Sequence, residues 1–343
     1  MQRKIAFLIC AMTAMISFNH AFAVSIEDSG KFEIKSASGD YKIGIGGLFT
    51  PMVQLNHEKI SANDSRWDLN WMLKRARLRL YGNAYDPALT YLLQLQFEND
   101  LINENSNRGS AKLMDASVSW AINQTWFHLA VGKFAVPGSR QQVISSAKSQ
   151  FLQSSSLLKV FDAVDPYGRD VGLLAHNAWD HQLEYALAVV SNGLAARVGY
   201  NHGHLDGYDA VDFAGGDLRC GVGASGFFRS DYMKEIGKTI LGSADYMVKY
   251  KHFSSNGAFY FKRENEQNWL GVGADAGYLI NGKWEPMLRY NWLNQAQVHG
   301  HEVMAGLSHY WYGHNVKSQL YFGMDFSKGY NKGFGGLGIQ LAL

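Results

Sequence analysis

Between residues 74 and 85 the chain alternates strictly between two kinds of side chain. Ala, Leu and Gly occupy the even positions from 76 to 84, whereas Arg75, Arg77 and Arg79 occupy the odd ones. A period of two is typical of a β-strand with two different faces. An arginine facing lipid near the bilayer midplane costs roughly 2–4 kcal/mol, and an unpaired one in a dry core costs more. One face of this strand must therefore meet water and the other an apolar environment.

The same alternation recurs along the chain, for example over residues 89–98, 115–120 and 319–326. Turn signals such as Asp86-Pro87 and Asn281-Gly282 separate the alternating runs. The edge strand of a soluble β-sandwich would explain one such run, but not their repetition. The pattern therefore predicts an all-β fold, a transmembrane antiparallel β-barrel with apolar side chains outward and polar side chains toward a water-filled lumen.

We count 16 strands, an even number as bacterial barrels have. Weak marking of residues 195–216 leaves counts of 14 and 18 open. The expected strand starts lie near Tyr41, Asn70, Leu89, Lys112, Trp126, Asp170, Gln182, Ala195, Asp217, Thr239, Ser255, Gln267, Gly282, His299, Asn315 and Gly333. With the N-terminus in the periplasm, the short turns are periplasmic and the longer loops are external.

The N-terminus resembles a secretory signal peptide. Arg3 and Lys4 precede an apolar run over residues 5–18, and Ala21-Phe22-Ala23 matches a cleavage site. The run is short for a membrane anchor of ~20 residues, which is the alternative. We expect residues 1–23 to be a signal peptide and 24–343 to form the barrel in the outer membrane of a Gram-negative bacterium. Loss of Arg3 and Lys4 leaves equal numbers of basic and acidic residues, so selectivity between ions must depend on local placement.

The arginine run is the leading candidate for function. Rows of charged side chains set ion selectivity in pores, and guanidinium groups can bind oxyanions through two parallel hydrogen bonds. Alternatively, the arginines pair with acidic residues on neighbouring strands, such as Glu98, Asp115 and Asp325, and merely solvate the wall. The alternation places further cations in the lumen, among them Lys133, Arg289 and Lys317.

Residues 136–169 show no strand alternation. Long segments of this kind are frequently functional loops. Seven serines and apolar residues such as Phe151 and Leu152 occur there, and a wholly exposed loop would not need the apolar ones. We expect this third external loop to fold into the lumen as a constriction, bringing Arg140, Lys148, Lys159 and Arg169 near its narrowest part. An external loop packed on its neighbours is the alternative.

Several motifs resemble the phosphate-selective porins O and P. They are the basic run over residues 74–82, Gly132-Lys133-Phe134-Ala135-Val136-Pro137, Ser145-Ser146 with Phe151, Gly168-Arg169-Asp170-Val171-Gly172 and Ser191-Asn192-Gly193. The resemblance implies a trimeric 16-stranded barrel with an inward loop and a basic wall. It also implies passive uptake of anions such as phosphate or polyphosphate. Gln153 and Ser154 depart from the acidic–basic pair common after the loop phenylalanine, and Leu343 stands where barrels usually end in an aromatic residue.

We therefore expect a porin that lets small hydrophilic solutes diffuse passively with an anion preference. No catalytic residue, cofactor, metal or nucleic-acid partner is expected, and the outer wall contacts membrane lipid. Gly221, Gly223 and Gly226 match a dinucleotide-binding spacing but lack the βαβ context. His299 and His301 are weak metal candidates. A barrel hydrolase and a surface adhesin are the alternative functions.

Overall fold

The computed structural model describes residues 22–26, 32–59, 64–97, 111–162, 164, 168–177, 181–230, 238–295, 298–327 and 330–343. Most of the expected signal peptide, residues 1–21, lies outside the described residues. Phe22–Ile26 forms a short strand, β1, which pairs with β2 (Phe32–Ser36). β2 also pairs with the start of β3. These two short strands were not predicted from the sequence.

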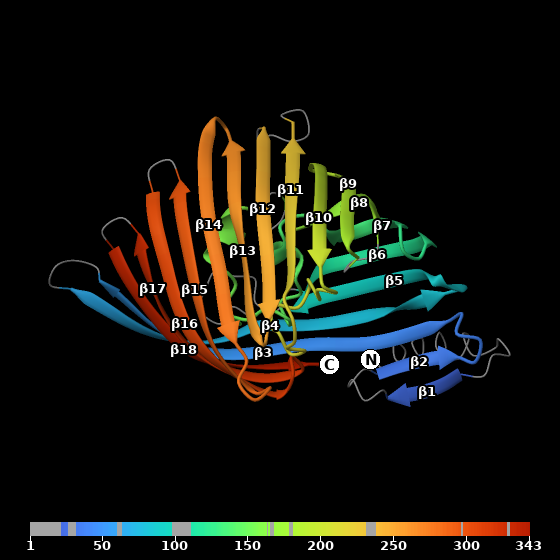
Figure 1. The fold of residues 1–343 in the computed structure, drawn as a ribbon, viewed down its shortest axis with the longest axis horizontal. Helices are drawn as coiled ribbons and strands as arrows, with labels where there is room; N and C mark the ends of the chain where they lie inside the picture. The colour runs from blue at the N-terminus through green and yellow to red at the C-terminus, as the bar shows by residue number, and fades with distance from the viewer. Residues whose placement is uncertain are drawn as a thin grey trace, which may run out of the picture.

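The remaining strands close a 16-stranded antiparallel barrel, which confirms the predicted fold class (Figure 1). Each strand pairs with its neighbour in sequence, and β18 pairs with β3 to close the ring. The strands are β3 (Lys42–Lys59), β4 (Ser65–Ala84), β5 (Asp86–Phe97), β6 (Ala111–Asn123), β7 (Phe127–Ala135), β8 (Arg169–His176), β9 (Leu183–Val190), β10 (Gly193–His202), β11 (Arg219–Arg229), β12 (Thr239–Tyr250), β13 (Phe253–Glu264), β14 (Gln267–Tyr278), β15 (Trp284–Gln295), β16 (Val298–Tyr312), β17 (Val316–Ser327) and β18 (Tyr330–Ala342).

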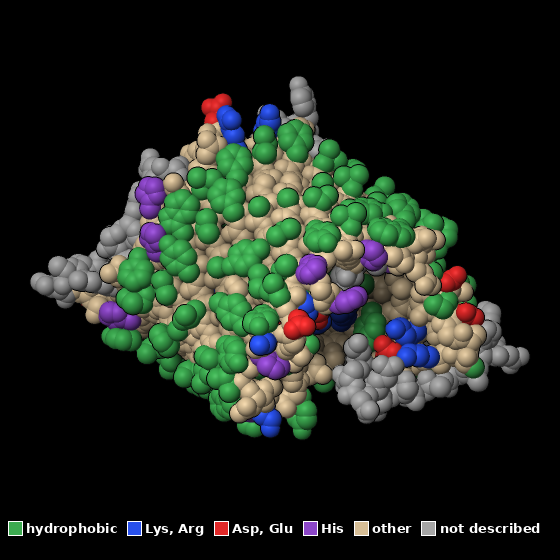
Figure 2. All heavy atoms as spheres, in the orientation of Figure 1, with side chains coloured by type: hydrophobic (Ala, Val, Ile, Leu, Met, Phe, Trp, Pro, Cys, Tyr) green, Lys and Arg blue, Asp and Glu red, His purple; other side chains and the backbone are tan. Residues whose placement is uncertain are grey.

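The two faces of the wall differ as the alternation predicts. In β10, buried and exposed side chains alternate along the whole strand. Outward side chains are large and apolar; Leu320 and Phe322, for example, are 58% and 65% exposed. Figure 2 shows such side chains spread over the barrel surface. Since an exposed apolar wall needs an apolar surrounding, this face is the one that meets lipid.

The connection between β7 and β8 packs against the inner wall of the barrel. It contains two short helices, α2 (Arg140–Val143) and α3 (Ser156–Val160), which contact β12–β15. In Figure 1 this green segment lies behind β12–β14. No helix among the described residues has the length and apolar character needed to cross a bilayer. We call residues 136–162 the inner loop.

Apolar side chains fix the inner loop in place. Phe151 and Leu152 are buried against Met287, Met304 and Tyr321 of the wall. Farther along the loop, Leu157 and Phe161 are fully buried, and the Phe161 ring stacks on Tyr260 at a centroid distance of 5.0 Å. Burying a side chain of this size contributes roughly 1.5–3 kcal/mol. The loop is therefore held by its own small core.

Residues 203–218, between β10 and β11, also turn inward. We call them the floor segment, because they emerge at the barrel end that carries Leu343, opposite the end from which the inner loop enters. Leu205 is buried with Ile144 of the inner loop and Met247, and Val211 is buried with Leu279 and Tyr310. The sequence predicted only a poorly marked turn here, at an end where we expected short turns.

Candidate permeation site

A cavity of about 910 Å³ lies between the inner loop and the wall formed by β4–β8. Charged side chains of both signs line it, but the cations are in excess. The cations are Lys74, Arg75, Arg77, Arg79, Lys159, Arg169 and Arg289, and the carboxylates are Asp115, Asp162 and Asp275. Seven cationic groups thus face three carboxylates, although residues 24–343 together carry equal numbers of basic and acidic side chains. The excess is local.

Arg75 connects the wall to the inner loop. Its Nη1 donates to the carbonyl oxygen of Leu152 at 2.9 Å, and its Nη2 lies 3.4 Å from Ser154 Oγ. The residue is only 4% exposed. Both acceptors are neutral, so these bonds hold the loop without cancelling the charge of the guanidinium.

Arg77 and Arg79 follow on the same strand face. Arg77 donates to Gln96 Oε1 at 2.8 Å and to Ser146 Oγ of the inner loop at 2.7 Å. Arg79 is exposed, lies 5.3 Å from the centre of the Tyr81 ring and makes no ion pair with a described residue. The three arginines therefore pass from a buried, bonded position to an open one along a single strand.

Two of the cavity's other arginines are paired with acids. Arg289 binds Asp275 through two bonds of 2.7 Å each, and Arg169 lies 3.4 Å from Asp115. The sequence suggests Asp115 as a partner of Arg75, Arg77 or Arg79. In the structure Asp115 is bound to Arg169. Glu98, another such partner, lies outside the described residues. Each of these pairs is locally neutral, so the surplus charge rests on the remaining cations.

Four predicted site residues do not line this cavity. Arg140 and Lys317 are fully buried, which corrects the prediction that they face passing ions. Lys317 Nζ donates to the Ser149 carbonyl at 2.7 Å, and Arg140 belongs to a buried ionic network. Lys133 is half-buried and Lys148 is exposed, and neither is among the lining residues. Parity alone could not separate lining side chains from those covered by the inner loop.

Lys74 lines the cavity but was not predicted as a lumen cation. In the register between β3 and β4, Thr50 pairs with Arg75 and Pro51 with Leu73, so Lys74 is the extra residue of a β-bulge. A bulge reverses the parity of the faces on its two sides. The sequence carried this signal, since Leu69 and Trp71 are apolar at odd positions whereas Arg75 and Arg77 are basic at odd positions.

Residues 53–208 match the family model described as phosphate-selective porin O and P. The chain is similar to this porin family over that segment, which is somewhat less than half of its length. The match confirms the family resemblance inferred from the sequence and supports an outer-membrane porin function. A search of curated proteins gives no match.

Solved structures show the same barrel fold as this porin. The anion-selective porin from Comamonas acidovorans is 14% identical with a TM-score of 0.62, over 89% of this chain and 100% of that one. OmpF of Salmonella typhi, in complex with daunomycin, is 11% identical with a TM-score of 0.61, over 89% of this chain and 98% of that one. The trimer form of OmpT from Vibrio cholerae is 10% identical with a TM-score of 0.52, over 87% of this chain and 99% of that one. At these identities the likeness concerns the fold.

The structure also places the side chains that bear on a hydrolase or a metal site. Ser308 and His309 are adjacent in sequence and lie on opposite faces of β16. Ser308 is buried on the inner face, where its hydroxyl accepts from Gln319 at 2.9 Å. His309 instead contacts the outward rings of Trp284 and Trp311. Among the described residues no group of three or more His, Cys, Asp or Glu side chains could hold a metal ion.

Proposed function

We propose that this porin conducts small anions in preference to cations by passive diffusion along the β4–β8 side of its lumen. The observation that carries the proposal is the excess of cationic over acidic side chains on one cavity, with Arg79 exposed among them. Water-filled passages lined by one sign of charge concentrate ions of the opposite sign. The inner loop narrows the same passage, so every ion passes close to the charged wall.

Phosphate is the anion that the lining groups suit best in our proposal. Guanidinium groups donate parallel hydrogen bonds to tetrahedral oxyanions. Serine hydroxyls of the inner loop, Ser146 and Ser154, lie beside Arg77 and Arg75 and can add neutral donors. The name of the family that the chain resembles supports this proposal. Anion preference and phosphate preference are separate proposals, since the first needs only charge and the second needs geometry.

We further propose that the chain is exported by its N-terminal signal peptide into a Gram-negative outer membrane and assembles there as a homotrimer. The apolar outer wall supports a position in lipid. The family resemblance supports the trimer, as does one matched porin that is described in a trimer form.

The test is a recording from single channels in a planar bilayer. A gradient of KCl should give a reversal potential with the sign of an anion-selective pore, and added phosphate should reduce the chloride current in a saturable way. A potential with the sign of cation selectivity would contradict the anion proposal. Linear, unsaturated block by phosphate would contradict phosphate preference alone.

A further inference from the structure

We propose that Arg140 is a positioning residue that holds the inner loop in its narrowing position, where wall, loop and floor segment meet. The inference rests on the proposed function, because it treats the inner loop as the constriction. Arg140 begins α2 and its side chain is fully buried. Arg140 therefore acts by positioning the inner loop and not by contacting the ions that pass.

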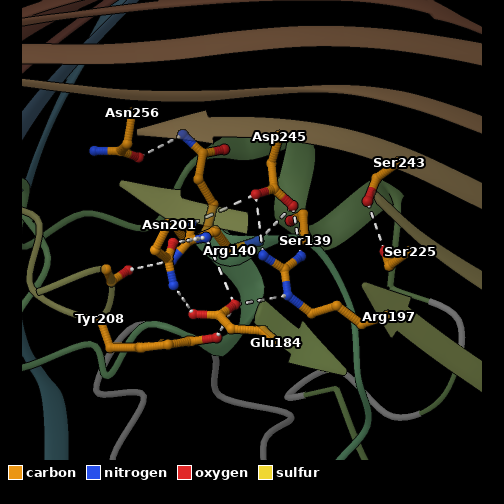
Figure 3. Close-up of polar contacts among 12 residues, drawn as sticks. Ser139, Arg140, Glu184, Arg197, Asn201, Tyr208, Ser225, Ser243, Asp245 and Asn256 are labelled. Carbon is orange, nitrogen blue, oxygen red and sulfur yellow. Dashed lines mark hydrogen bonds and ion pairs between the residues drawn. The ribbon is translucent and has the colours of Figure 1, made fainter. Parts of the chain in front are cut away.

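Arg140 belongs to a buried network of two arginines and two carboxylates (Figure 3). Its Nη2 lies 3.6 Å from Glu184 Oε2 and its Nε lies 3.5 Å from Asp245 Oδ1. Arg197 binds Asp245 at 2.6 Å and lies 3.9 Å from Glu184. All four side chains are 0% exposed, and their formal charges cancel. Removing one partner would leave a charge buried without compensation, which is strongly destabilising.

The start of the inner loop is bound to the wall at three consecutive residues. The Gly138 carbonyl accepts from Arg197 Nη1 at 2.9 Å, and Ser139 Oγ lies 2.8 Å from the hydroxyl of Tyr260. The backbone N–H of Arg140 donates to Asp245 Oδ2 at 3.0 Å. The loop therefore leaves β7 in a fixed direction, and the ionic network sets that direction.

The floor segment meets the same guanidinium from the other side. Arg140 Nη1 donates to the Gly207 carbonyl at 3.1 Å, and the Arg140 guanidinium lies 5.4 Å from the centre of the Tyr208 ring. Tyr208 in turn donates to Glu184 at 2.9 Å. A second tie joins the floor to the loop, since the Ala210 N–H donates to the Lys148 carbonyl at 3.1 Å. Arg140 thus couples the inner loop to both the wall and the floor.

The packing around Arg140 excludes a passing ion. A Cβ added at Gly207 would lie 2.0 Å from Nη1, and one added at Gly221 would lie 3.2 Å from Nη2. Glycine at these two places makes room for the guanidinium, which is 0% exposed. A residue enclosed in this way acts on permeation through the loop it holds.

The test compares Arg140→Gln with Arg140→Lys and Arg79→Gln in the full-length porin. Uptake of neutral sugars of increasing size into proteoliposomes measures the width of the pore, and the reversal potential measures its selectivity. Arg140→Gln should speed the uptake of the larger sugars several-fold with the reversal potential nearly unchanged. Arg140→Lys should restore part of the wild-type size limit. Arg79→Gln should show the reverse, a shifted potential with an unchanged size limit.

A direct role of Arg140 in binding ions would overturn the proposal, and its signature is a shifted reversal potential with an unchanged size limit. Hydrogen exchange of the inner-loop amides gives a readout that needs no transport. Exchange there should rise in Arg140→Gln; wild-type exchange in that variant would also overturn the proposal. If the wild-type porin gives no current but exchange rises as expected, the proposed function fails and the positioning role stands.

Two further variants keep the proposal testable if Arg140→Gln does not fold. The double variant Arg140→Gln with Glu184→Gln keeps the network neutral and removes the ion pair between residues 140 and 184. Tyr208→Phe removes one hydroxyl donor and no charge. Both should raise inner-loop exchange and the sugar size limit in the same direction as the single variant. Unchanged values in both, with the barrel folded, would contradict the role of the network.

Discussion

Arg75 and Arg79 lie on one face of β4, yet their guanidinium groups have opposite surroundings. Arg75 is 4% exposed and donates to the Leu152 carbonyl at 2.9 Å, whereas Arg79 is exposed beside the Tyr81 ring. The first holds the inner loop, and the second meets the solution that fills the cavity. The run of arginines in the sequence thus combines a structural part and a part open to ions.

Arg79→Gln should lower the anion preference of the pore. A unit charge about 6 Å from an ion in water contributes about 0.7 kcal/mol, which corresponds to about a threefold change in the permeability ratio. The measurement is the reversal potential in a KCl gradient. Arg66→Gln is the control, since Arg66 lies on the same strand but is bound to Asp68 at 2.9 Å and does not line the cavity. Equal shifts in both variants would contradict a local effect.

Phe151→Ala should loosen the inner loop. Phe151 is 1% exposed and packs beside Met287 and Met304, so its truncation leaves a cavity that costs about 3–5 kcal/mol. The expected result is faster hydrogen exchange in the inner loop and a larger sugar size limit. Phe322→Ala is the matched control, because Phe322 is 65% exposed on the outer wall. A loop that exchanges no faster in Phe151→Ala than in the control would refute this packing.

Gly271→Ala should displace α3 from the wall. An added Cβ would lie 2.5 Å from Phe161 Cε2 and 3.1 Å from Leu157 Cδ2, and such overpacking costs about 1–3 kcal/mol. The denaturant midpoint of unfolding should fall. Gly333→Ala serves as the control, since its Cβ meets only the His57 Cβ, at 4.0 Å. An unfolding midpoint as high as that of the control would contradict the prediction, because it would mean that the barrel wall and α3 accommodate the added methyl group.

Acidification should destabilise the floor segment through His314, which lies in the turn between β16 and β17. Its Nε2 contacts Asp209 Oδ1 at 2.8 Å, and its Nδ1 is buried without a hydrogen-bond partner among the described residues. Burial, together with the nearby charges of Lys317 and Lys148, lowers the pKa of His314 below its ordinary 6.5, although Asp209 opposes the shift.

The sign follows from linkage. Below pH 6.5 the unfolded chain binds a proton on this residue before the folded chain does, so stability falls as the pH drops from there toward the lowered pKa. The unfolding midpoint should therefore be lower at about pH 5.5 than at about pH 7.5. His314→Gln should reduce that difference. An equal pH dependence in the variant would assign the effect to other groups.

Much of the barrel could be predicted because side-chain alternation is a local property of the chain. The expected start of β14 at Gln267 and of β12 at Thr239 coincide with the observed ones. The largest difference in a strand start is at β4, which begins at Ser65 rather than near Asn70, because the polar Arg66 and Asp68 at its beginning resemble a loop.

The interior was less predictable, because it depends on contacts between segments far apart in sequence. Arg140 looked like a lumen cation, but its partners Glu184 and Asp245 come from other strands, and nothing in the local sequence shows that they converge on it. The inward course of residues 203–218 depends in the same way on Leu279 and Tyr310. Parity assigns a side chain to the inner face but does not say what covers it.

The most direct test of the central claim is the reversal potential of a single wild-type channel in a KCl gradient. The claim is that an excess of cations on the cavity wall favours anions, although residues 24–343 carry equal numbers of basic and acidic side chains. We expect a reversal potential displaced toward the chloride equilibrium potential, and its displacement should shrink at high salt as the wall charges are screened. A potential displaced toward the potassium equilibrium potential would contradict it.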